Sequence, residues 1–499
     1  MNTSIFENLF VFEMANNHQG SVAHGLKIIQ EMAEIARKFK LKATVKLQYR
    51  QLDTFIHPDY RDRSDVQHIP RFISTALSRD DFHQLVQATK AAGMLSMVTP
   101  FDEDSVDVCL EHDVDILKVA SCSATDWPLL EKIAAAKRPV IFSTGGVSIS
   151  EVDKLVSFFA HQNIAFAIMH CVALYPTPNA KLQMGIIRRL ANRYPGIPIG
   201  YSGHESPDNH DPVKIAVAMG ARMFERHVGV PTDKIKLNTY SMAPGETEAW
   251  VHAAFIAKSI VGDPTCKELP DEERASLLSL QRGVYARIPI KKGERISPEA
   301  IFFAMPCQPE QTTSGQFGSY RTTYVASKDY NPNEAIYEAA RPDIIKEIRN
   351  YIHDAKGMLY EARIQLGTEF TVELSHHSGI EKFGQVGCLI VNVINREYCK
   401  KLIVVLPGQH HPNHRHQKKE ETFQVLHGEV EVTLNGGNYV LQPGNKLLIE
   451  RGSWHSFHSP MGAIFEEIST THIVGDSYYE DPAIAGLDPM QRKTVLETW

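Results

Sequence analysis

The sequence predicts an α/β protein whose largest part is a (β/α)8, or TIM, barrel. Between about residue 9 and residue 262, short apolar runs rich in β-branched residues alternate with stretches whose apolar residues have helical spacing. Eight such pairs in about 250 residues match the usual size of a barrel whose strands are buried on both faces. A doubly wound open sheet is the alternative, but the GxGxxG turn expected after its first strand is missing.

The strands and helices of the barrel can be assigned from this alternation. The predicted strands are Leu9–Asn16, Ala43–Tyr49, Leu95–Phe101, Ile116–Ser121, Pro139–Thr144, Phe166–Cys171, Ile197–Ser202 and Met223–Gly229. Apolar residues at three- and four-residue spacing predict helices over Gly20–Lys40, Asp80–Ala92, Ser150–His161, Lys181–Tyr194, Asp208–Gly220 and Glu246–Val261.

The residues after the barrel predict two further domains. Thr265–Ala275 is polar and acidic and is interpreted as a linker. The turn-rich unit Arg282–Ala340 has a marginal core of its own and is expected to dock on another surface. Asp343–Ala355 is predicted as a connecting helix, and short alternating runs after Leu359 predict an all-β barrel or sandwich. We expect domains over residues 1–264, 280–340 and 356–499.

The composition excludes several classes of function. The formal net charge is −7 and no basic stripe is present, so nucleic-acid binding is not expected. The 7 cysteines include no CxxC pair and do not suggest a disulfide framework. The N-terminus lacks a secretion signal, and no apolar run approaches the roughly 18 residues of a membrane helix. We expect a cytoplasmic protein with reduced thiols and no membrane partner.

Polar residues gather where the barrel strands are predicted to end. They are Glu13, Asn16–His18, Lys46, Thr99, Lys118, Ser121, Ser143–Gly146, Ser202, His204 and His227. The carboxyl ends of barrel strands open onto one face, and that face carries the chemistry of such barrels. Lysines, hydroxyls and Gly-rich turns suit a phosphate and a carboxylate. Two histidines without a cysteine suit a catalytic metal that keeps open positions.

The barrel also carries a series of short motifs in a fixed order. They are Glu13-Met-Ala-Asn-Asn-His-Gln-Gly20, Val45-Lys-Leu-Gln48, Thr99-Pro-Phe101, Leu117-Lys-Val-Ala-Ser121, Phe142-Ser-Thr-Gly145, His170-Cys171, Tyr175-Pro176, Gly200-Tyr-Ser202 and Glu225-Arg-His227. With these motifs the chain resembles the sialic acid synthase family over nearly all of residues 9–262. The segment Tyr285–Ala340 resembles the antifreeze-like (SAF) domain that follows the barrel in that family, as a small α+β unit.

The resemblance implies a condensation of phosphoenolpyruvate with an aldose, giving a 3-deoxy-2-keto sugar acid and phosphate. It implies that phosphoenolpyruvate is held by Lys46, Thr99, Lys118, Ser121, Ser143 and Ser202. His204 and His227 would bind Mn²⁺ or Mg²⁺, and Glu13 would position or deprotonate a water. Asn17 and Tyr175 would contact the sugar. A homodimer is implied, with each antifreeze-like domain reaching the barrel of the partner subunit.

The chain departs from the family on the side that holds the acceptor sugar. The family has an acidic residue at the position of Ser123 and an asparagine near Ala173. Leu237–Ser241 and Ala304–Cys307 replace two further family motifs that reach the sugar. Because a hydrogen-bonding site rejects analogues that lack its partner groups, these changes predict an acceptor other than N-acetylmannosamine.

The last domain has a metal-ligand pattern of its own. Gly408, His414, His416, Glu421 and Gly428 are followed by Gly444 and His455 at fixed spacings. Histidines one residue apart on a strand point to one face. The pattern resembles both motifs of the cupin family, an all-β barrel, which implies that His414, His416, Glu421 and His455 bind Zn²⁺, Fe²⁺, Mn²⁺ or Ni²⁺. An isomerase or epimerase, an oxygenase, and a sensing or dimerising module all remain open for this domain.

Two other functions compete with the synthase. Lys46 or Lys118 could form a Schiff base in an aldolase or isomerase. The barrel could also be a sugar-binding protein without catalytic activity, since acceptor-side motifs are lost. The retained histidines, lysines and serines favour the synthase.

Overall fold

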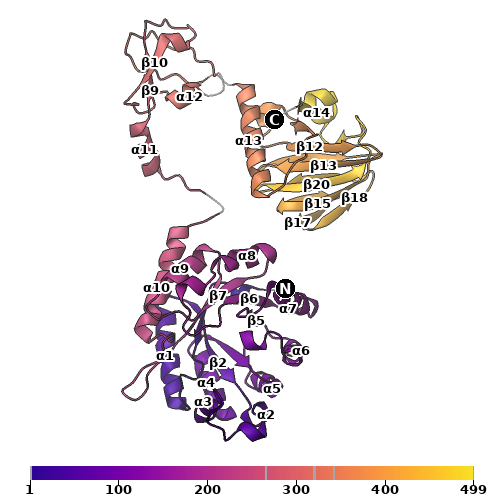
Figure 1. The fold of residues 1–499 in the computed structure, drawn as a ribbon. Helices are drawn as coiled ribbons and strands as arrows, with labels where there is room; N and C mark the ends of the chain where they lie inside the picture. Colours follow the sequence, from indigo (N-terminus) through magenta and orange to yellow (C-terminus); the bar gives the residue numbers. More distant parts are fainter. Residues whose placement is uncertain (1–2, 265–266, 319–321, 341–342, 498) are drawn as a thin grey trace. The chain divides into compact units, whose positions relative to one another are not determined.

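The computed structural model describes residues 3–264, 267–318, 322–340, 343–497 and 499. The chain divides into two compact units, residues 1–267 and residues 268–499 (Figure 1). Among the described residues, no helix combines the length and the apolar character needed to cross a membrane.

The first unit is a closed barrel of eight parallel strands. They are β1 Leu9–Glu13, β2 Lys42–Tyr49, β3 Leu95–Pro100, β4 Ile116–Val119, β5 Val140–Ser143, β6 Phe166–Cys171, β7 Ile199–Gly203 and β8 Met223–His227. The pairing of β8 with β1 closes the ring and brings His227 opposite Glu13. This pairing confirms the predicted barrel, and the open doubly wound sheet is wrong.

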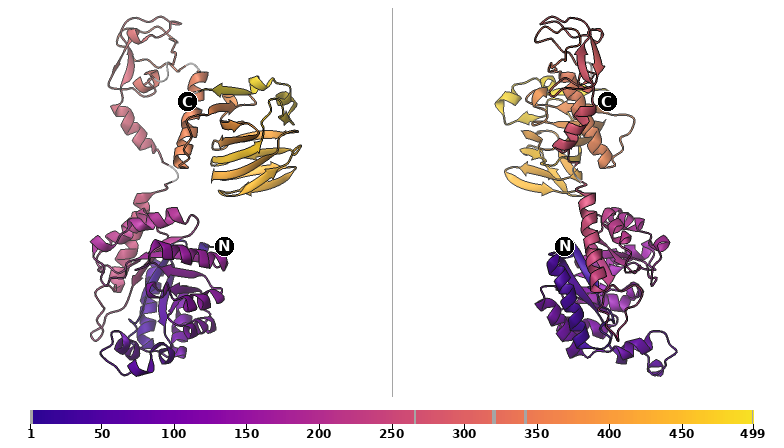
Figure 2. Two further views of the ribbon diagram at one scale, coloured as in Figure 1. Left: turned by 45° about the vertical axis from the view of Figure 1, so that its right-hand side comes forward. Right: turned by 90° about the vertical axis from the view of Figure 1, so that its left-hand side faces the viewer.

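Helices surround these strands, as Figures 1 and 2 show. They are α1 Val22–Lys38, α4 Arg79–Ala91, α5 Glu103–Glu111, α6 Trp127–Ala135, α7 Ile149–His161, α8 Gly185–Arg193, α9 Asp211–Ala218 and α10 Pro244–Val261, with short helices α2 Leu52–Phe55 and α3 Ile69–Ser74 between β2 and α4. Ser21 caps α1, and Ser78 and Ser148 form capping boxes at α4 and α7. Short 3-10 turns occur at Ser4–Phe6, Pro58–Tyr60, Ser121–Ser123 and Asn179–Lys181.

The predicted strand Leu9–Asn16 ends early, at Glu13. The chain then turns sharply, because Ala15 and Gln19 adopt positive φ angles and Asn17 N–H donates to the carbonyl of Met14. This turn places Asn17 and His18 over the carboxyl end of the barrel, where both are buried.

The second unit begins with a helix where a linker was predicted. Helix α11 spans Asp271–Leu280, so the interpretation of Thr265–Ala275 as a linker is wrong from Asp271 onward; residues 265 and 266 lie outside the described part. Pro270 precedes the helix, and three acidic residues in its first turn complement the positive end of the helix dipole. The small unit that follows contains β9 Gly283–Ala286, a 3-10 turn at Pro298–Ala300, β10 Ile301–Ala304 and α12 Ser314–Gly318 around its own apolar cluster.

The remaining residues form two antiparallel sheets. One has the strand order β18-β15-β20-β13-β12-β11-β22, and the other has the order β17-β16-β19-β14-β21. The strands are β11 Thr371–Ser375, β12 Cys388–Asn395, β13 Tyr398–Val405, β14 His410–Arg415, β15 Glu421–Gly428, β16 Val430–Leu434, β17 Gly437–Leu441, β18 Lys446–Ile449, β19 His455–His458, β20 Ala463–Thr470, β21 Tyr478–Tyr479 and β22 Lys493–Leu496, with the short helix α14 Pro482–Ala485 and 3-10 turns at Ile380–Lys382 and Pro489–Arg492. The predicted all-β cupin fold is confirmed.

The predicted connecting helix is longer than expected. Helix α13 spans Ile344–Glu361 and contributes Ala355 and Leu359 to the same apolar cluster as Leu374 and Phe383. Its apolar face therefore belongs to the core of the β domain.

Candidate active site and metal centre

The barrel site is built around a buried carboxylate, Glu225, on β8. Its Oε1 lies 3.1 Å from Nζ of Lys46, and its Oε2 lies 3.2 Å from Nζ of Lys118. The hydroxyl of Ser202 donates to Oε1 at 2.8 Å. Lys46 also forms an ion pair with Glu13, whose Oε1 accepts a hydrogen bond from the N–H of Ala15 at 2.6 Å. All of these charged side chains are buried.

The two carboxylates of this cluster have opposite pKa shifts. Burial raises the pKa of Glu13, and Lys46 opposes this only in part. Burial alone would raise the pKa of Glu225, but Lys118 and Lys46 lower it below its ordinary value. Glu13 is thus the carboxyl group able to carry a proton, while Glu225 stays ionised between two ammonium groups.

Three predicted hydroxyl groups lie at or near the carboxyl ends of β3, β4 and β5. Ser121 accepts a hydrogen bond from the N–H of Gly145 at 3.0 Å, and Ser143 is buried at the end of β5. A side chain at Gly145 would lie 2.7 Å from the Ser121 hydroxyl, so glycine is needed for this approach. The hydroxyl of Thr99 is buried and has no hydrogen-bond partner among the described residues. A buried donor without a partner is costly and marks a place for a ligand group.

His204 and His227 face each other, with their ring centres 5.3 Å apart. Nδ1 of His204 lies 3.2 Å from the carbonyl of Val172, which leaves Nε2 as the free electron-pair donor. Burial lowers the pKa of His204 to about 4 and that of His227 well below its ordinary value. Neutral imidazoles are the donors that a divalent metal needs, and in His204 a backbone carbonyl also fixes one ring nitrogen.

The two predicted sugar contacts lie in different surroundings. The ring of Tyr175 packs 4.3 Å from that of His204 and is largely exposed. The amide of Asn17 is buried and donates to the carbonyl of Val228 at 2.8 Å and to the hydroxyl of Ser241 at 3.1 Å. Asn17 therefore fixes the loop after β8, and its contact with a sugar stays a prediction.

Sequence reasoning assigned no role to Glu225, Arg50 or Tyr240, although Glu225 lies in a motif that it quoted. Glu225 lies two residues before His227 on β8, so strand alternation alone places both side chains on the inner face. Arg50 follows β2, with its guanidinium 3.6 Å from the ring centre of Phe101 and 4.2 Å from that of Phe72. Its Nη2 donates to Oε1 of Gln48 at 3.0 Å, its Nε is buried without a partner, and no carboxylate of the described chain pairs with it. The ring of Tyr240 packs 5.1 Å from that of His227.

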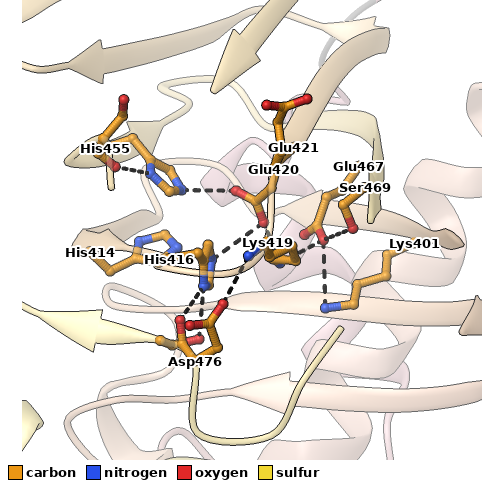
Figure 3. Close-up of polar contacts among 12 residues, drawn as sticks. Lys401, His414, His416, Lys419, Glu420, Glu421, His455, Glu467, Ser469 and Asp476 are labelled. Atoms are coloured by element: carbon orange, nitrogen blue, oxygen red, sulfur yellow. Dashed lines mark hydrogen bonds and ion pairs between the residues drawn. The ribbon is translucent and has the colours of Figure 1, made fainter. Parts of the chain in front are cut away.

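A second candidate centre lies in the β domain, where three histidines converge (Figure 3). His414 on β14 pairs directly with His455 on β19, and His416 follows two residues later. One nitrogen of each ring lies within 4.8 Å of the others. Nδ1 of His414 lies 3.1 Å from the carbonyl oxygen of Pro412. Nδ1 of His416 lies 2.7 Å from that of Asp476, and Nδ1 of His455 lies 3.1 Å from that of Ser453. These contacts leave the three Nε2 atoms as the nitrogens that could bind one metal ion.

Glu421 lies beside these histidines and is held by a lysine. Its Oε1 is 3.4 Å from Nε2 of His416, and its Oε2 is 3.2 Å from Nε2 of His455. Nζ of Lys419 forms an ion pair with Oε1 of Glu421 and lies 2.9 Å from Oε1 of Glu467. The same oxygen of Glu467 lies 3.7 Å from Nζ of Lys401. Oε2 of Glu421 has no hydrogen-bond partner among the described residues, so it is the oxygen that suits a metal.

Fold and sites together define a (β/α)8-barrel protein that carries a cupin with a three-histidine centre. A model of the NeuB family matches residues 32–265, and a cupin domain model matches residues 401–465. The chain belongs to the NeuB family and carries a cupin domain after the barrel.

Known proteins similar to this chain support the assignment. A crystallised protein of Chromobacterium violaceum, assigned to spore coat polysaccharide biosynthesis as protein E, is 42% identical over 67% of this chain and 100% of that chain, with a TM-score of 0.65. N-acetylneuraminate-9-phosphate synthase of Homo sapiens is 29% identical over 45% of this chain and 62% of that protein. N,N'-diacetyllegionaminic acid synthase of Campylobacter jejuni is 24% identical over 66% of this chain and 99% of that protein.

Proposed function

We propose that the barrel is a sugar-acid synthase that joins phosphoenolpyruvate to an aldose. The observation that carries the proposal is the buried cluster of Glu225, Lys46 and Lys118 at the strand ends that also hold His204 and His227. The names of the human and Campylobacter relatives, both sugar-acid synthases, support the reaction class. In the reaction, C3 of the enol bonds to the aldehyde carbon and the aldehyde oxygen gains a proton. Water then adds to C2, and the bond from C2 to the phosphate oxygen breaks, releasing phosphate.

The chain's own groups can hold the phosphoenolpyruvate. The ammonium groups of Lys46 and Lys118 supply fixed positive charge, and the hydroxyls of Thr99, Ser121 and Ser202 supply hydrogen-bond donors. Fixing the enol beside the aldehyde removes much of the entropic barrier to bond formation. Ser143 completes the set at the end of β5.

Glu13 is the proposed proton carrier of the reaction. Because its pKa is raised, it can accept a proton from a water that adds to C2 and return it later. The N–H of Ala15 fixes one carboxyl oxygen, and Lys46 contacts the other. This geometry holds the carboxyl group in one orientation while its proton is exchanged.

His204 and His227 would hold a divalent metal ion, Mn²⁺ or Mg²⁺. When bound, such an ion polarises the aldehyde and stabilises negative charge on its oxygen. Val172 fixes the His204 ring, and the rings of Tyr175 and Tyr240 pack against the two imidazoles.

The acceptor is proposed to differ from N-acetylmannosamine. Asn17 and Ser241 bond to each other, so two groups near the loop after β8 are already paired. Nη2 of Arg50 donates to Oε1 of Gln48 at 3.0 Å, and its buried Nε–H has no partner among the described residues, in a cavity that Asn16, His18 and Gln48 also line. These donors suit an aldose with additional oxygen groups, such as a modified sugar.

Two further features belong to the proposal. The chain is proposed to act as a homodimer, in which the antifreeze-like unit of residues 280–340 reaches the barrel of the partner subunit. Residues 1–264, 280–340 and 356–499 are proposed as separate domains, supported by an apolar cluster in each. Helix α13 spans the start of the third range and packs on its core. Light scattering of the purified chain tests the dimer, and a monomeric mass at assay concentration would contradict it.

The test of the function is a phosphate-release assay with phosphoenolpyruvate and a panel of aldoses, with the product identified by mass spectrometry. We expect phosphate release that requires both an aldose and a divalent metal and that stops with a chelator. Best turnover with N-acetylmannosamine would reject the altered acceptor but leave the synthase intact. Covalent trapping of substrate on Lys46 or Lys118 by borohydride would instead support the Schiff-base aldolase.

A further inference from the structure

The cupin encloses a cavity whose lining is unusually rich in charge. Four cations and three carboxylates line it, beside the imidazoles of the metal centre; the charged residues are Lys401, Lys419, Arg492, Lys493, Glu373, Glu421 and Glu467. Charged side chains inside a small β-barrel are costly unless they are paired or serve a ligand. The pairing within the cavity therefore shows which charge is left for a ligand.

Each of the three lysines has a carboxylate partner. Lys419 lies 2.9 Å from Glu467, and Lys401 lies 3.7 Å from the same carboxylate. Lys493 lies 3.2 Å from Glu373. Lys401 and Glu467 also face each other in the register of β13 and β20, so strand pairing fixes this contact.

Arg492 is the exception. Within the described ranges, no carboxylate lies in ion-pair distance of its guanidinium. The group lies 4.9 Å from the ring centre of Tyr479, and the Tyr479 ring stacks 5.5 Å from that of His414. One aromatic ring thus separates an unpaired cation from a ligand of the metal centre.

The wall between these two positions offers neutral polar groups. Nε2 of His377 lies 2.9 Å from Nε2 of His411 and 3.2 Å from the hydroxyl of Ser375. Nδ1 of His377 is buried without a hydrogen-bond partner among the described residues. Such groups bind the hydroxyls of a polyol, and a buried nitrogen without a partner indicates that one is expected there.

We propose that this cavity binds a polyhydroxylated anion, with its acidic group on Arg492 and its hydroxyl side on the metal held by His414, His416 and His455. The guanidinium presents a fork that matches a carboxylate or a phosphate. The excess of positive charge, which a divalent metal increases, selects an anion over a neutral sugar. The inference rests on the cupin residues and goes beyond the proposed function of the barrel, whose product would belong to the same chemical class.

The experiment is calorimetric titration of the full chain loaded with Mn²⁺. The probes are D-gluconate, D-glucose 6-phosphate and D-glucose, which share a polyol chain and differ in the acidic group. We expect at least one of the two acidic probes to bind about tenfold or more tightly than glucose. A preference for gluconate indicates a sugar acid, and a preference for glucose 6-phosphate indicates a sugar phosphate.

Variants separate the cavity from the barrel. Arg492→Gln should lower the affinity for the acidic probes about tenfold and leave the affinity for glucose unchanged. Arg492→Lys should keep part of the affinity for the acidic probes. Arg451→Gln, which removes an exposed cation of the same domain, should change nothing. Binding should persist in the full chain with His204→Ala and His227→Ala and should vanish with His414→Ala and His416→Ala.

Glucose binding as tightly as both acids, or acid binding unaffected by Arg492→Gln, would overturn the proposal. If the thermal midpoint of Arg492→Gln equals that of the wild type, a loss of binding is not a loss of fold. If Arg492→Gln proves unstable, Arg492→Lys provides the same check. If the wild-type chain releases no phosphate but binds gluconate through Arg492, the synthase fails and this inference stands.

Discussion

The protein contains two buried charge clusters, and the signs of the charges in one are the reverse of those in the other. In the barrel, one carboxylate, Glu225, lies between two lysines. In the cupin, one lysine, Lys419, lies between the carboxylates of Glu421 and Glu467. The central group of each cluster is ionised because two opposite charges outweigh the cost of burial.

The difference in sign suits the clusters to the different tasks that we propose for them. The barrel cluster holds two cations ready at a strand end, where an incoming anion can share them with Glu225. The cupin cluster instead fixes one oxygen of Glu421 and leaves the other toward the histidines. The first arrangement favours binding an anionic substrate, and the second favours orienting a metal ligand.

The largest expected effect comes from removing one cation of the barrel cluster. Lys118→Met leaves Glu225 with Lys46 alone and removes half of the fixed positive charge. We expect kcat/KM for phosphoenolpyruvate to fall about a thousandfold, or roughly 4 kcal/mol, in the phosphate-release assay. Lys154→Met, an exposed lysine on α7, is the matched control and should be neutral. A loss of less than tenfold would contradict the role of the cluster.

The matching change in the cupin removes the central cation. Lys419→Met leaves Glu421 and Glu467 buried without their shared partner, so we expect the domain to lose about 3 kcal/mol in urea unfolding. Lys446→Met, an exposed lysine of the same domain, should cost little. Adding Glu467→Gln to Lys419→Met should restore part of the stability. If Lys419→Met and Lys446→Met are equally stable, the ion pairs of Lys419 do not stabilise the domain.

Most of the barrel site follows from the sequence, because strand alternation and the shared carboxyl edge fix it. Lys46, Lys118, Ser202 and His227 all lie on barrel strands. Parallel register pairs Lys46 and His227 with Glu13, and Ser202 with Glu225. Glu225 obeys the same rule and could have been found from its spacing to His227. Arg50 and Tyr240 could not, because they lie in connections whose conformation depends on aromatic packing rather than periodicity.

In the cupin, the sequence predicts the candidate metal ligands but not the charged residues that line the cavity. The spacing of His414, His416 and His455 predicts the convergence of the three histidines, since His414 and His455 pair in register. Lys419 sits between two ligands in sequence, where a lysine is ordinarily solvated, and only the fold shows that it is buried. Arg492 comes from a turn far along the chain, so no local pattern connects it to the histidines.

A smaller effect is expected from a buried histidine beside the barrel site. Burial lowers the pKa of His18 to about 4, below its ordinary value near 6.5. The unfolded chain therefore binds a proton first as pH falls, and stability is lost between pH 6.5 and 4. We expect His18 to account for about 2 kcal/mol of the stability lost between pH 7 and pH 5. In denaturant unfolding at pH 7 and pH 5, His18→Gln should reduce the difference between the two free energies of unfolding. If that difference is the same as in the wild type, the prediction is wrong.

The smallest effect tests the acceptor side of the barrel. Arg50 lines a cavity together with Gln48, whose Nε2 donates to Oε1 of Glu13 at 3.5 Å, and no carboxylate of the described chain pairs with Arg50. Replacing it with glutamine should raise KM for the acceptor about tenfold, or about 1.4 kcal/mol, because a neutral amide offers fewer donors. KM for phosphoenolpyruvate should stay unchanged, since Lys46 and Lys118 are intact. Arg61→Gln, an arginine in the same connection that contacts the backbone of Ile56 and Asp53, is the matched control. An equal rise in both KM values would place Arg50 in the phosphoenolpyruvate site and not with the acceptor.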